Sequence, residues 1–187
     1  MRSFPNANQL RGRAIGSIFF ACFGAGWLFL SLAAKQRITF ATVSGVMLGM
    51  LLLLLTAFYL LRQSRRWPRL PDDPAVGRAF AWINAIQWIA IPVAVIALGK
   101  LHLDAFATSA IAAIIGLHMF PLARLFRYPM HYVTGAVLVA WAAASALLVS
   151  PDQLQGSAAM GTGLILWASA AVTLFRSQQA ARQAAPA

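Results

Sequence analysis

Residues 39–61 read TFATVSGVMLGMLLLLLTAFYLL, and no charged side chain interrupts them. A helix rises about 1.5 Å per residue, so about 20 residues cross a hydrocarbon core of about 30 Å. Arg37 and Arg62 stand just outside the two ends of the stretch. A continuous apolar run bounded by charges is typical of a membrane-spanning helix, whereas the strands of a transmembrane barrel would alternate.

Five further apolar runs of similar length lie on either side of this one. Together the runs predict an all-α integral membrane bundle of six transmembrane helices, which consecutive pairing would arrange as three helical hairpins. No room remains for a separate soluble unit, so we expect a single domain over residues 1–187. We place the spans at about 14–34, 39–61, 79–100, 105–123, 132–150 and 157–175.

The composition favours the same class of protein. The chain is 60% hydrophobic and 10% charged, whereas soluble domains hold about 25% charged residues. A net charge of +11 would suggest nucleic acid in a soluble protein, but here the basic residues lie in short segments between apolar runs. We therefore expect the lipid bilayer as the main partner, and no nucleic acid. The only cysteine, Cys22, excludes an internal disulfide.

The basic residues also predict which way the helices cross. Twelve of the 15 fall in segments on one side of the six spans. Because Lys and Arg accumulate in cytoplasmic loops, we expect both chain ends in the cytoplasm, with the protein in a bacterial cytoplasmic (inner) membrane. The expected inner side carries Arg2, Arg11, Arg13, Arg62, Arg65, Arg66, Arg69, Arg78, Arg124, Arg127, Arg176 and Arg182, and the outer side carries Lys35, Arg37 and Lys100.

One sizeable loop, residues 62–78, reads RQSRRWPRLPDDPAVGR on the expected cytoplasmic side. Pro68, Pro71 and Pro74 recur at every third position, and proline in a helix interior removes a hydrogen bond and clashes with the preceding turn. We therefore expect the whole loop to be irregular and to lie at the membrane surface. An orientation signal and a linker between hairpins account for the loop, and the alternative is contact of its arginines and Trp67 with anionic lipid head groups.

Several kinds of membrane chemistry find no matching residues. No Asp, Glu, Lys or Arg lies well inside a predicted span, and the chain contains no Glu. Proton-coupled carriers commonly keep an ionisable carboxylate at membrane depth, and a metalloprotease motif requires Glu. No Gly-x-Ser-x-Gly sequence marks a serine nucleophile. We expect no catalytic residue, no metal and no cofactor, which favours a protein that is not an enzyme.

Three polar side chains are expected at similar depth near the inner side. His118 lies six residues from the boundary at Arg124, roughly 9 Å deep. Asn84 and Gln87 lie roughly 8 and 12 Å deep and share one helical face. Because unpaired polar groups are costly in hydrocarbon, we expect the three to meet inside the bundle. They would either hold helices together or line a ligand cavity.

Arg124 and Arg127 frame the expected inner mouth of that cavity and suit an anionic substrate or a lipid phosphate. Pro121 should weaken the helix beside His118, as broken helices do in many membrane binding sites. These residues predict a transporter or channel-like protein that binds a small solute or lipid in a polar inner-leaflet cavity. The alternatives are a non-catalytic structural or regulatory subunit of a membrane complex, and a membrane enzyme.

Small residues recur at helical spacing in two of the spans. Gly45 and Gly49 form a GxxxG pair, and Ala136, Ala140 and Ala144 form a stripe. Small residues allow helix backbones to approach closely in lipid. We expect both sets to pack within the chain, and a homo-oligomer formed through these faces is the alternative.

Overall fold

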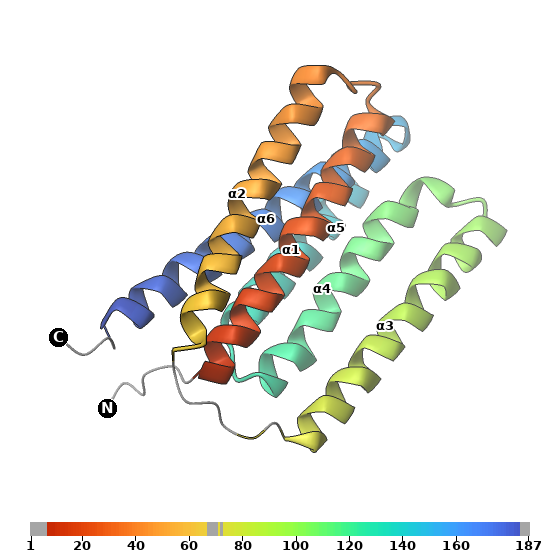
Figure 1. Ribbon diagram of the computed structural model, residues 1–187. Helices are drawn as coiled ribbons and strands as arrows, with labels where there is room; N and C mark the ends of the chain where they lie inside the picture. Colours follow the sequence, from red (N-terminus) through yellow and green to blue (C-terminus); the bar gives the residue numbers. More distant parts are fainter. Residues whose placement is uncertain (1–6, 67–70, 72, 184–187) are drawn as a thin grey trace.

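The computed structural model describes residues 7–66, 71 and 73–183, which form six long α-helices and one short 3-10 helix with no strand among them (Figure 1). All six helices are long and apolar enough to cross a membrane, so the prediction of an all-α membrane protein is confirmed. The elements are α1 (Ala7–Ala34), α2 (Phe40–Ser64), α3 (Pro74–Lys100), η1 (Asp104–Phe106), α4 (Ala107–Leu125), α5 (Met130–Leu148) and α6 (Pro151–Gln183).

Successive helices run up and down, so α1, α3 and α5 begin at the same end of the bundle at which α2, α4 and α6 finish (Figure 1). We call this end the basic end, because it carries Arg13, Arg124 and Arg176. The candidate site lies there.

One helix start and one helix end correct the predicted boundaries of the loop. α3 begins at Pro74 rather than near residue 79, and the Asp73 carboxylate caps it by accepting the N–H of Ala75 at 2.8 Å. Proline suits the first helical position, where its missing N–H would have no partner. α2 also continues to Ser64, so the prediction that residues 62–78 are irregular throughout is wrong at both ends. Residues 67–70 and 72 of that loop lie outside the described residues.

α6 lies at the centre of the bundle and contacts α1, α2, α4 and α5. Glycine pairs mark the closest backbone approaches. A Cβ on Gly163 would lie 2.8 Å from the carbonyl oxygen of Gly24, and one on Gly135 would lie 2.6 Å from that of Gly116. Only glycine leaves room for such an approach, so these pairs set the α1–α6 and α4–α5 distances.

Two tryptophan side chains occupy the space that the missing Cβ of a glycine leaves on a neighbouring helix. The indole of Trp167 on α6 packs against Gly24 of α1 and Gly49 of α2, and its Nε1 donates to the carbonyl of Ala21 at 3.0 Å. Trp141 of α5 packs against Gly161 in the same manner. A buried indole needs a partner for its N–H, and here a helix carbonyl supplies it. These contacts join α1, α2, α5 and α6.

The predicted small-residue packing holds for only part of the two sets. Gly49 packs against Trp167, but a Cβ on Gly45 would meet no atom within 4 Å. Ala136 and Ala140 are exposed, which contradicts the expectation that their stripe packs within the chain. The reason is that α5 buries the neighbouring face, which contains Gly135 and Leu138.

α3 lies at the edge of the bundle, and α4 is its only substantial partner among the long helices (Figure 1). None of its residues is buried. Its far side exposes large apolar side chains, including 72% of Trp82 and 65% of Ile86. In a membrane such a face contacts lipid, so α3 is a thin wall between the bilayer and α4.

Candidate functional site

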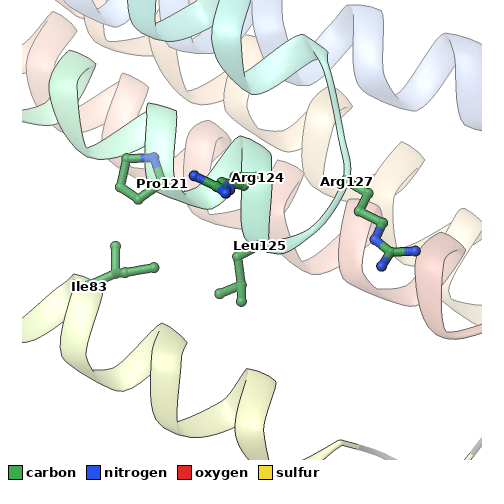
Figure 2. A pocket seen from close by; sticks show the side chains of 5 residues that line it. All are labelled: Ile83, Pro121, Arg124, Leu125 and Arg127. Carbon is green, nitrogen blue, oxygen red and sulfur yellow. The ribbon is translucent and has the colours of Figure 1, made fainter.

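Between α3 and α4 at the basic end lies a shallow groove of about 450 Å³ that is largely open to its surroundings, which we call the cavity (Figure 2). Small-molecule pockets in proteins commonly measure about 300–1,000 Å³. The rings of Phe80 on α3 and Phe126 after α4 lie 5.8 Å apart and join the two helices near it. The residues that line the cavity are Ile83, Pro121, Arg124, Leu125 and Arg127.

The lining divides into an apolar part and a cationic part. Figure 2 shows Ile83 pointing from α3 toward Pro121 and Leu125 pointing toward α3, while Arg127 extends from the turn that follows α4. Arg124 and Arg127 supply the only charges of the lining. No hydrogen bond or ion pair ties either guanidinium to the residues that the structure describes. Their donors are therefore available to an anion.

The turn that ends α4 holds Arg127 in an uncommon backbone conformation. The N–H of Tyr128 donates to the carbonyl of Ala123 at 3.0 Å, and the N–H of Arg127 donates to that of Arg124 at 3.3 Å. This pattern is a Schellman motif, in which glycine usually occupies the left-handed position. Arg127 occupies it with φ of 48°. Left-handed backbone is costly for a residue with a Cβ, so the arginine side chain stands at a strained point.

The structure places His118 against α3, but not in the cavity lining. The half-buried imidazole lies close to the backbone carbonyl of Ile83, whose side chain lines the cavity. Asn84 uses its Nδ2 on the carbonyl of Phe80, one turn earlier in the same helix, at 2.8 Å. The Oε1 of Gln87 is buried and has no partner among the described residues. The three predicted side chains therefore share the α3–α4 region without hydrogen bonds to one another.

A cluster of aromatic rings supports the turn beside the cavity. The Tyr128 ring lies below the Arg13 guanidinium, with 4.7 Å between the centroid and Cζ, and its hydroxyl hydrogen-bonds that of Thr173 at 3.1 Å. The His131 ring lies 5.2 Å from Tyr128 and 6.0 Å from Phe20, in edge-on geometry. His131 therefore packs among aromatic rings. These contacts fix the turn that carries Arg127 to α1 and α6.

A second, smaller groove of about 290 Å³, which we call the smaller cavity, lies open on the surface of α3. Its lining consists of Arg78, Ala81, Trp82 and Ala85. At 100° per residue these positions lie on the opposite side of α3 from Ile83 and Gln87. A guanidinium beside an indole over small apolar residues again combines a cation with an apolar surface.

Sequence reasoning found the two arginines, because charges next to an apolar run are conspicuous. It missed Ile83 and Leu125, since an apolar residue in a span gives no sign of which helix gap it faces. Within the described part of the chain, no three His, Cys, Asp or Glu side chains gather to hold a metal ion. Comparison of the chain with protein-family models, curated proteins and solved structures gave no match.

Proposed function

We propose that this chain is a transporter or channel-like protein of a bacterial cytoplasmic membrane, and that it binds a small anionic solute or a lipid between α3 and α4. The observation that carries the proposal is a pair of arginines, Arg124 and Arg127, that have no partner among the described residues and lie on a cavity whose remaining lining is apolar. Guanidinium groups bind phosphate and carboxylate oxygens through several parallel hydrogen bonds.

The distribution of basic residues supports a location in the inner leaflet. Positively charged segments are retained in the cytoplasm, and Arg124 and Arg127 belong to the twelve basic residues of one side. With the basic end in the cytoplasm, the cavity opens at the level of the inner head groups. The cytoplasmic leaflet contains anionic lipids, which give its surface a negative charge. These lipids compete with any anionic solute for the two arginines.

The loose attachment of α3 favours transport over a purely structural role. α3 buries no residue, and its contact with the bundle is confined mainly to α4 and η1. Pro92 and Pro121 lie inside α3 and α4 and leave a helix carbonyl in each without its usual partner. Transporters alternate access by moving one group of helices against another, with interrupted helices at the binding site. Movement of α3 would open and close the cavity.

Mass spectrometry of the molecules that co-purify with the protein tests this proposal. We expect an anionic molecule with the wild-type chain and its loss from an Arg124→Gln/Arg127→Gln variant. The matched control is Arg65→Gln/Arg66→Gln, which removes two charges from the same end and touches neither cavity. Loss of the ligand from both variants, or from neither, would contradict a specific site at α3–α4.

A structural or regulatory subunit is the second candidate function. The exposed faces around Gly45 and around Ala136 and Ala140 allow close approach of another helix, from a second copy or from a different membrane protein. If the protein acts in this way, Ala136→Leu/Ala140→Leu should release the associated chain, and Arg124→Gln/Arg127→Gln should have no effect on that association.

A further inference from the structure

The cavity between α3 and α4 differs from the usual site for a soluble anion. Polar donors normally surround such an anion, because any unmatched side of it loses the hydrogen bonds of water. Here three of the five lining residues, Ile83, Pro121 and Leu125, are apolar. The two guanidiniums stand at the end of α4, and Pro121 lies one turn deeper. Polarity therefore falls from the mouth of the cavity toward its interior.

A membrane lipid has the same gradient. Its phosphate lies at the boundary of the hydrocarbon core, and its acyl chains continue into the core. We propose that the cavity binds a phospholipid of the leaflet at the basic end, with the phosphate at Arg124 and Arg127 and an acyl chain beside Ile83 and Pro121. This inference rests on the proposed function and narrows its ligand from a small anionic solute or a lipid to an anionic phospholipid.

The position of α3 gives the lipid a route from the side. Exposed apolar residues on its far face, such as Ile89 and Val93, place lipid against this helix. Since α3 packs mainly on α4, a lipid that enters between them has no second layer of protein to displace. The Phe80 and Phe126 rings, whose centroids lie 5.8 Å apart, join the two helices at the basic end. Their contact does not lie along the lateral path of the lipid.

The smaller cavity on the far side of α3 supports this assignment. Arg78 and Trp82 flank Ala81 and Ala85, so a cation again meets an apolar strip at the same end of the helix. Tryptophan favours the head-group level of a bilayer, and arginine attracts anionic lipid there. At the basic end, both sides of α3 thus combine an arginine with apolar side chains, as contact with an anionic lipid requires.

The test uses the full chain in phosphatidylcholine vesicles that contain a small fraction of photoactivatable phosphatidylglycerol. We expect cross-links to α3 and α4 peptides, and removal of the two arginines by Arg124→Gln/Arg127→Gln should lower the yield about tenfold or more. Arg65→Gln/Arg66→Gln should leave it unchanged. Equal yields from the wild type and the α4 double variant would show that the lipid contact is unspecific and overturn the inference.

A parallel measurement separates lipid from free phosphate. Ile83→Trp fills the apolar part of the cavity and leaves both arginines in place, so it should abolish the lipid cross-links. Inorganic phosphate at millimolar concentration should not compete for them. Binding of inorganic phosphate that depends on Arg124 without any lipid cross-link would overturn the lipid assignment and keep the proposed anion site. Binding of neither probe would remove the proposed function as well.

Discussion

At the scale of single residues, the backbone at Arg127 favours glycine, whereas the proposed binding site requires the arginine side chain. Its φ of 48° belongs to the left-handed region, where glycine is the usual choice at the end of a helix. Gln36 and His102 occupy the same region after α1 and α3, with φ of 51° and 57°. The chain thus uses side chains other than glycine at three such turns. Only at Arg127 does the side chain line the α3–α4 cavity.

Arg127→Gly therefore separates stability from ligand binding. Glycine relieves the left-handed strain, although it adds entropy to the unfolded chain, so we expect the free energy of unfolding to stay constant or rise by up to about 1 kcal/mol. Ligand retention should fall, because one of the two guanidiniums is lost. Reversible unfolding in SDS and mass spectrometry of bound molecules measure the two effects. Gln36→Gly, which touches no cavity, should give the same stability change and full retention.

His118 on α4 lies close to the carbonyl of Ile83 on α3. His118→Ala removes this polar contact between the helices, and a polar contact inside a membrane contributes at most about 1 kcal/mol. We expect a loss of stability of that size with ligand retention per folded molecule unchanged, because His118 does not line the cavity. His102→Ala, in the exposed turn after α3, is the control. A folded His118→Ala protein without ligand would instead show that the imidazole contacts the ligand.

At the scale of helices, two glycines test which faces pack. A methyl group at Gly135 would lie 2.6 Å from the backbone oxygen of Gly116, and neither helix can yield without separating. Gly135→Ala should therefore destabilise the protein by about 1–3 kcal/mol, as overpacking does in close-packed interiors. Gly45→Ala, where no atom lies within 4 Å, should be neutral in the same unfolding measurement. Equal effects would contradict the α4–α5 packing described above.

The spans could be predicted from sequence because bilayer thickness fixes the length of an apolar run. Helix ends were harder to predict, since Pro74 and Pro151 act as first residues of helices rather than as helix breakers. The face of each helix that packs against its neighbours was the hardest feature to predict. Gly45 and Gly49 look equivalent in the sequence, and only the position of Trp167 makes Gly49 a packing contact and leaves Gly45 open. Likewise Arg124 was foreseeable at a span boundary, whereas Ile83 was not.

At the scale of the whole molecule, orientation in the membrane decides which leaflet the cavity faces. The basic asymmetry predicts a cytoplasmic basic end. Single cysteines introduced at Asp152 and at Arg66, in a Cys22→Ser background, test this with a membrane-impermeant thiol reagent on intact cells. We expect labelling at position 152 and none at position 66. The reverse pattern would place the arginines in the outer leaflet.

The central claim is that Arg124 and Arg127 hold an anionic lipid between α3 and α4. An experimental structure of the protein in a lipid nanodisc tests it most directly. We expect non-protein density whose head lies within about 3 Å of guanidinium nitrogens of both arginines and whose tail passes Ile83. A cleft closed by protein side chains, or occupied by a helix of a second copy, would contradict the claim.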